Sequence, residues 1–131
     1  MSTNIKRRLV IENDEKNYTI NDVLLISSKI GIPVVFDNLH HEINGDNSDI
    51  KEIILKCRKT WREKDGLQKI HYSQQAKGKK VGKHSDTIEP KTFLNFLKKI
   101  KGIDLDIMFE VKDKNISVEK IHDILKNKAH V

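Results

Sequence analysis

Four short apolar runs alternate with four longer amphipathic segments, and this alternation limits the possible folds more than any other feature. The predicted strands lie at residues 8–12, 32–37, 67–73 and 104–112. Segments with helical periodicity follow them at residues 20–30, 50–61, 91–100 and 118–125. Such alternation is typical of βαβ units, which have parallel strands and right-handed crossovers. We therefore expect an α/β fold with one parallel sheet in a single domain spanning residues 1–131.

Local signals mark where the predicted helices begin and end. Thr19 with Asp22 three residues later resembles a capping box, and Gly31 is expected to close that helix. Ser117 is expected to cap the last helix, and residues 38–49 are interpreted as a polar loop. The second helix is expected to bury one apolar stripe, made of Ile50, Ile53, Ile54, Cys57 and Trp61.

Composition narrows the class of protein. With 37% hydrophobic and 34% charged residues, the chain is expected to be globular with a highly charged surface. Its net charge of +6 is compatible with a polyanionic partner but is also common in ordinary domains. Cys57 is the only cysteine, which excludes an internal disulfide and a cysteine-rich zinc site. The sequence has neither a signal-peptide core nor a run long enough to span a membrane, so a soluble, cytoplasmic protein is expected.

Charged side chains recur at the carboxyl ends of the predicted strands. Glu12 and Asp37 end the first two strands, His71 lies in the third and Glu110 near the end of the fourth. Because ligands bind at the carboxyl ends of parallel strands, these side chains are expected to converge. Carboxylates and imidazoles without sulfur suit Mn²⁺, Zn²⁺ or Fe²⁺, and several carboxylates can hold two or more ions for phosphodiester cleavage.

Each residue also has a simpler explanation when it is taken alone. Glu12 could cap a helix, and His40 and His84 could lie on solvated loops. Lys69 and His71 share one face of the third strand, which could be the wet face of an edge strand. The argument for a site therefore depends on every strand contributing at the same end.

The polar positions and their surroundings resemble the UV damage endonuclease family. The matching segments cover about residues 8–114 and read RLVIENDEK, IPVVFDNLHHE, TW before KIHYS, HSD and DIMFEVKDK. The resemblance implies a TIM-barrel-like metalloenzyme of DNA repair, similar to endonuclease IV and the xylose-isomerase-like barrels. Such enzymes bind divalent ions, typically manganese, with zinc or magnesium as alternatives, and nick DNA on the 5′ side of UV photoproducts.

The same resemblance implies roles for individual residues. The metal ligands would be Glu12, Asp37, His40, Lys69, His71, His84 and Glu110. Glu12, Lys69 and Glu110 would be catalytic, and Lys69 would carry a carbamate. Asp86 would orient its loop or His84.

The chain departs from the family in having four predicted strands, whereas a TIM barrel needs eight strands and about 250 residues. The matching region corresponds to the family's C-terminal half, so the expected fold is a (βα)₄ half barrel that lacks the strands thought to probe damaged bases. Self-association or a separate N-terminal half could complete it.

The leading functional hypothesis is a UV damage endonuclease acting on double-stranded DNA, with the activity of these 131 residues alone in doubt. A metal-dependent sugar-phosphate isomerase or epimerase of the same superfamily and a non-catalytic DNA-binding fragment are the alternatives. Four loop lysines are expected either to clamp DNA phosphates or simply to be solvated: Lys77, Lys79, Lys80 and Lys83.

Overall fold

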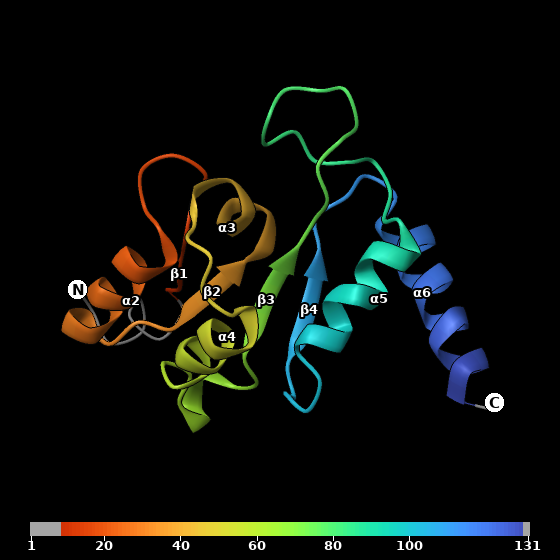
Figure 1. Cartoon of the computed structure of the whole chain (residues 1–131). Helices are drawn as coiled ribbons and strands as arrows, with labels where there is room; N and C mark the ends of the chain where they lie inside the picture. The colour runs from red at the N-terminus through yellow and green to blue at the C-terminus, as the bar shows by residue number, and fades with distance from the viewer. Residues whose placement is uncertain (1–8, 130–131) are drawn as a thin grey trace.

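The computed structural model describes residues 9–129, which form a parallel sheet flanked by helices (Figure 1). The four strands stand side by side in chain order, each parallel to the next. They are β1 (Ile11–Glu12), β2 (Val34–Asp37), β3 (Lys69–Tyr72) and β4 (Asp106–Phe109). This confirms the predicted α/β class and corresponds to half of an eight-stranded barrel. Arg8, the expected start of the first strand, lies outside the described residues.

Four helices pack against one face of the sheet. They are α2 (Ile20–Ile30), α4 (Ile50–Arg58), α5 (Pro90–Lys99) and α6 (Lys114–Ala129). Their apolar side chains form one core with the residues of the sheet that face them, including Phe36, Ile70 and Tyr72. The alternation of side chains in β3 is therefore as expected, with Ile70 and Tyr72 buried and Lys69 and His71 on the other face.

The predicted limits of α2 are confirmed in atomic detail. Thr19 Oγ1 accepts a hydrogen bond from the Asp22 amide at 3.2 Å, and Asp22 Oδ2 accepts one from the Thr19 amide at 3.0 Å. Gly31 closes the helix with a φ of 70°, a left-handed conformation that glycine adopts without a steric penalty. Cys57 is buried in the core, and this burial raises its pKa to about 12.

The expected polar loop at residues 38–49 is in part a helix. Helix α3 (Asn38–Asn44) begins directly after β2, and Asp37 caps it by accepting a hydrogen bond from the His40 amide at 2.9 Å. Leu39 and His41 are buried residues of this helix. The prediction was wrong because a seven-residue helix contains too few turns to display a periodic apolar stripe.

Two further local predictions were wrong. Helix α4 ends at Arg58, so Trp61 is not part of its apolar stripe; the indole Nε1 instead donates to the Val34 carbonyl at 2.8 Å. Ser117 does not cap α6, which begins three residues earlier at Lys114. Its hydroxyl donates to Asp113 Oδ1 at 2.5 Å and accepts from the Ile88 amide at 3.0 Å.

The concave face of the sheet, opposite the helices, carries a hollow of about 420 Å³. Trp61, Lys69 and His71 help to line it. Val10 and Met108 in this hollow are 47% and 49% exposed, as expected for side chains that would face a barrel interior. A short 3₁₀ helix, η1 (Glu63–Asp65), lies between Trp61 and β3.

Candidate metal centre

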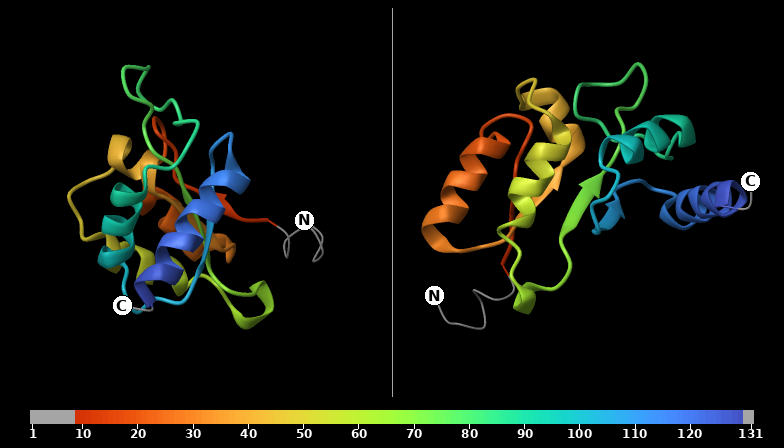
Figure 2. Two further views of the ribbon diagram at one scale, coloured as in Figure 1. Left: turned by 90° about the vertical axis from the view of Figure 1, so that its right-hand side faces the viewer. Right: turned by 60° about the horizontal axis from the view of Figure 1, so that its bottom comes forward.

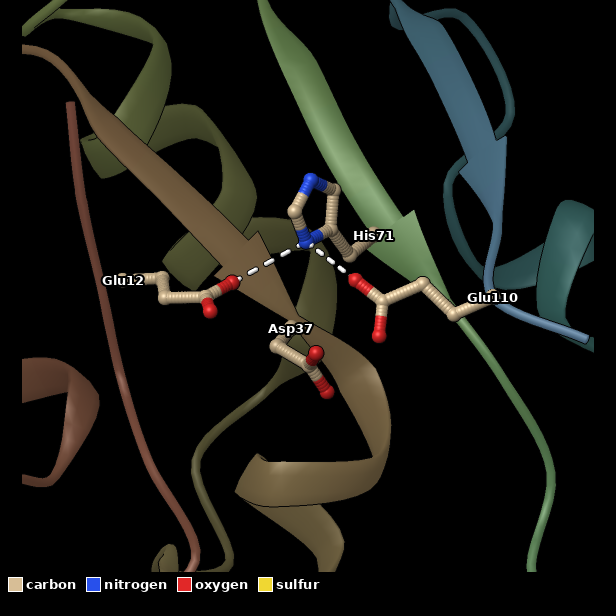
Figure 3. A group of neighbouring side chains, drawn as sticks. All are labelled: Glu12, Asp37, His71 and Glu110. Carbon is tan, nitrogen blue, oxygen red and sulfur yellow. Dashed lines mark ion pairs between the residues drawn. The ribbon is translucent and has the colours of Figure 1, made fainter. Parts of the chain in front are cut away.

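Each of the four strands delivers one polar side chain to a common point at its carboxyl end. Glu12 and Asp37 are the last residues of β1 and β2, His71 lies in β3, and Glu110 follows β4. One ligand atom from each of the four lies within 4.8 Å of the others. Figure 3 shows the imidazole between the two glutamates, with Asp37 facing the same space. We call these four residues the acidic centre.

His71 is the positively charged member of the acidic centre. Its Nδ1 lies 2.5 Å from Glu110 Oε1 and 3.0 Å from Glu12 Oε2. The pKa of His71 is raised to about 10, first by Glu110 and then by Glu12, against the opposing effect of burial. The same interaction lowers the pKa of Glu110. At neutral pH the imidazolium therefore compensates part of the negative charge of the three carboxylates.

Asp37 is almost completely buried, with 1% of its surface exposed. Its Oδ1 caps α3 through the His40 amide, whereas Oδ2 accepts no hydrogen bond from the described residues. Burial is the largest cause that raises the pKa of Asp37, and the bond to the His40 amide opposes it. A buried carboxylate oxygen without a donor lacks compensating positive charge. A cation in the acidic centre would supply that charge.

His40, in helix α3, and His84, in the loop after β3, flank the acidic centre. His40 Nδ1 lies 2.8 Å from the Asn13 carbonyl and 3.5 Å from Asp37 Oδ2. Because a carbonyl can only accept, His40 Nδ1 donates its proton to it, and Nε2 faces Glu15 Oε2 at 3.5 Å. His84 Nδ1 lies 3.8 Å from Glu110 Oε2, and the centroids of the two imidazole rings are 6.5 Å apart.

Lys69 lies on the same face of β3 as His71, two residues nearer the start of the strand, and is exposed in the concave hollow. It forms no ion pair with any carboxylate in the part of the chain that the structure describes. Asp86 pairs with Lys112 at 3.6 Å, and its carbonyl accepts from the Asp113 amide at 3.1 Å. Asp86 thus ties its loop to the segment after β4.

The lysine-rich loop, residues 73–89, projects beyond the carboxyl end of β3 in every view (Figures 1 and 2). The side chain of Gln75 holds it from within: Nε2 donates to the Lys80 carbonyl at 2.9 Å, and Oε1 accepts from the Gly82 amide at 2.8 Å. The Ala76 amide also donates to the Lys83 carbonyl at 2.8 Å. All four lysines singled out in the sequence are exposed on this loop.

The donor set fits a divalent ion. Three carboxylates and one imidazole are typical ligands of hard to borderline cations, and the unpartnered Asp37 Oδ2 faces the group. Sequence reasoning missed two buried amides beside this centre, Asn13 and Asn38. The available signal was that each directly follows a candidate carboxylate, in Glu12-Asn13 and Asp37-Asn38. Among the described residues, no helix has the length and apolar character to cross a membrane.

Comparison with known proteins assigns the family. The family model described as UV-endonuclease UvdE matches residues 1–131. A UV DNA damage endonuclease of Clostridium perfringens (strain 13 / Type A) is 52% identical over 128 residues, which cover 96% of this chain and 31% of that protein. A UV DNA damage endonuclease of Bacillus mycoides (strain KBAB4) is 38% identical over 117 residues, which cover 87% of this chain and 37% of that protein.

The fold comparison agrees with the sequence comparison. The crystal structure of SacUVDE aligns with a TM-score of 0.89 at 40% identity, covering 100% of this chain and 44% of that one. The chain spans about a third of the length of the curated relatives named above. It belongs to the UV-endonuclease UvdE family.

Proposed function

We propose that this chain provides half of the metal centre and part of the DNA-binding surface of a metal-dependent endonuclease, which cleaves DNA on the 5′ side of UV lesions. The observation that carries the proposal is the convergence of Glu12, Asp37, His71 and Glu110 at the carboxyl ends of four successive parallel strands. The proteins similar to this chain are named as UV DNA damage endonucleases, which favours nuclease chemistry over sugar-phosphate isomerisation.

The four residues of the acidic centre would hold the metal, together with His40 and His84. Bound divalent ions would supply an activated water and neutralise charge on the scissile phosphate. Asp37 would contribute Oδ2, which accepts no hydrogen bond from a described residue, and His40 would contribute Nε2. Glu12 and Glu110 hold the His71 ring between them, which orients Nδ1 towards the same point. Manganese suits this sulfur-free set, and zinc or magnesium are the alternatives.

Lys69 is the third proposed catalytic residue, with Glu12 and Glu110. It precedes His71 by two residues and so lies about 6.6 Å nearer the amino end of the strand. Its four-carbon side chain can span that gap along the concave hollow, which both residues line. A carbamate on Lys69 would turn a cation into an anion with two oxygens, suited to bridge two metal ions.

DNA would lie across the carboxyl end of the sheet. The lysine-rich loop supports this proposal because it places Lys77, Lys79, Lys80 and Lys83 on the side of the sheet that carries the acidic centre. Lesion recognition would depend on residues beyond these 131. We therefore expect the chain alone to bind metal more weakly than a complete family member and to nick irradiated DNA poorly.

Calorimetric titration with Mn²⁺ tests the proposal. The 131-residue chain should bind Mn²⁺, and the double variant Glu12→Gln, Glu110→Gln should lose this binding because two of the three carboxylates are neutralised. Glu119→Gln, an exposed acid on α6, is the matched control and should leave binding unchanged. Equal Mn²⁺ affinity in the wild type and the double variant would refute a metal centre at this position.

A further inference from the structure

Two buried asparagines connect the strands at the point where strand pairing ends. Asn13 follows β1 and Asn38 follows β2, and they are 1% and 3% exposed. Each directly follows a member of the acidic centre, Glu12 or Asp37. A buried amide side chain requires hydrogen-bond partners, and both amides find them on the main chain of the next strand.

The two amides make the same pair of hydrogen bonds. Asn13 Oδ1 accepts from the Asp37 amide at 2.9 Å, and its Nδ2 donates to the Asp37 carbonyl at 3.1 Å. Asn38 Oδ1 accepts from the Ser73 amide at 3.0 Å, and its Nδ2 donates to the Ser73 carbonyl at 3.1 Å. Each side chain thus replaces a stretch of backbone pairing and fixes both main-chain polar groups of one residue at the carboxyl end of the neighbouring strand, Asp37 at the end of β2 and Ser73 just after β3.

Asn13 also fixes the ring of His40. Its own carbonyl lies 2.8 Å from His40 Nδ1 and therefore accepts the proton of that nitrogen. Asn13 therefore holds the main chain of Asp37 with its side chain and orients the His40 ring with its main-chain carbonyl. Asn38 acts on the other side of β2: it holds Ser73, two residues after His71, and thereby the end of β3.

We propose that Asn13 and Asn38 are positioning residues of the metal centre, which set the spacing of its ligands across β1, β2 and β3. This inference rests on the proposed metal-binding function. Both asparagines act through the ligands and touch neither metal nor substrate. Groups that orient metal ligands in this way typically account for about a 10- to 100-fold change in metal affinity.

A matched control separates positioning from general stability. Gln68 is also a buried amide, but its Nε2 donates to the Ile54 carbonyl at 3.0 Å, before the start of β3 and away from the acidic centre. We expect Asn13→Ala and Asn38→Ala to weaken Mn²⁺ binding about 10- to 100-fold in calorimetry. Gln68→Ala should lower the melting temperature comparably and leave the Mn²⁺ affinity unchanged.

A second measurement needs no metal. Nitrogen NMR of the metal-free chain should show His40 protonated at Nδ1 in the wild type and in Gln68→Ala. In Asn13→Ala the main-chain carbonyl remains, but the side-chain bonds that hold residue 13 against Asp37 are lost, so this tautomer preference should weaken. If Asn13→Ala does not fold, Asn13→Asp replaces it, because that variant keeps the acceptor for the Asp37 amide and loses the donor.

The outcomes distinguish the two proposals. If the wild type binds no Mn²⁺, the proposed function fails and the positioning role fails with it. If the wild type binds Mn²⁺ and the asparagine variants bind it equally well, or no more weakly than Gln68→Ala, the positioning role is overturned.

Discussion

At the scale of single residues, the charge balance of the acidic centre depends on one imidazole. Three carboxylates converge there, and His71 is the cation that pairs with two of them. Asp37 is compensated less well, since burial raises its pKa and its Oδ2 has no donor among the described residues. The metal-free protein is therefore expected to keep His71 protonated over a wide pH range.

NMR titration of the metal-free chain should place the pKa of His71 at about 10, well above its usual 6.5. A raised pKa means that this group stabilises the fold fully below pH 6.5 and that its contribution disappears as the pH rises through about 10. Glu110→Gln should lower the pKa of His71, because Glu110 is the largest cause of its rise. His41, whose pKa is lowered by burial, is an internal control in the same spectrum. Titration of His71 at 6.5 would contradict the geometry.

Lys69 should change its chemical state when metal binds. An ammonium cannot ligate a cation, whereas the neutral amine reacts with carbon dioxide to form a carbamate and release a proton. With Zn²⁺ and ¹³C-labelled bicarbonate, carbon NMR should show a carbamate signal that is absent without Zn²⁺ and in Lys69→Arg. Lys112→Arg, a change at an exposed lysine paired with Asp86, should retain the signal. If a metal-loaded protein with a complete barrel gives no carbamate signal, Lys69 does not bridge two metal ions.

At the scale of elements, the loops after the strands contain more structure than their composition indicates. The segment after β2 forms α3, which is capped by a residue of the acidic centre. The lysine-rich loop is braced by the side chain of Gln75 and by a bridge between Gln75 and His84. This bridge links the lysines to one of the flanking histidines, so the proposed DNA-binding surface and His84 lie on one loop.

Neutralising Lys77, Lys79, Lys80 and Lys83 to glutamine should reduce the salt dependence of DNA binding. The slope of log affinity against log salt should fall by about 0.7 to 0.9 for each phosphate that no longer pairs with a lysine. The control removes the same charge from four exposed lysines near the carboxyl ends of α4 and α5: Lys56, Lys59, Lys98 and Lys99. Both helices run away from the carboxyl end of the sheet, where DNA would lie, so the control should keep the wild-type slope. Equal slopes in all three proteins would indicate a merely solvated loop.

At the scale of the whole molecule, the described residues form an open sheet with one covered and one uncovered face. The helices cover the convex face, whereas Val10 and Met108 are half exposed on the concave one. Within the described residues, β1 and β4 each pair on one side only. Unpaired strand edges and exposed apolar surface favour association.

The isolated 131-residue chain should therefore form dimers or larger assemblies. Light scattering over a range of concentrations measures this directly, and Met108→Lys should shift the distribution towards monomer. Leu25→Lys provides the control, because Leu25 is similarly exposed but lies on α2, whose buried residues face the convex side. A wild-type chain that stays monomeric at high concentration would contradict the prediction.

The sequence alone determined the parallel α/β class and the four residues of the acidic centre. Period-two alternation assigned Ile70 and Tyr72 to the face opposite His71, and parallel pairing brought the carboxyl ends of all strands to one edge. These inferences succeeded because local periodicity and the βαβ connection are properties of neighbouring residues.

Only the tertiary structure decided how those residues are held. Asn13 is hydrogen-bonded to Asp37, 24 positions away in the sequence, and Asn38 to Ser73, 35 positions away. Trp61 bonds to Val34, and His40 turns towards Asn13, across 27 positions each. An amide, an indole or an imidazole in the sequence can bond to any polar group that folding brings near it. The partner is therefore set by the packing of strands against one another, which local pattern does not encode.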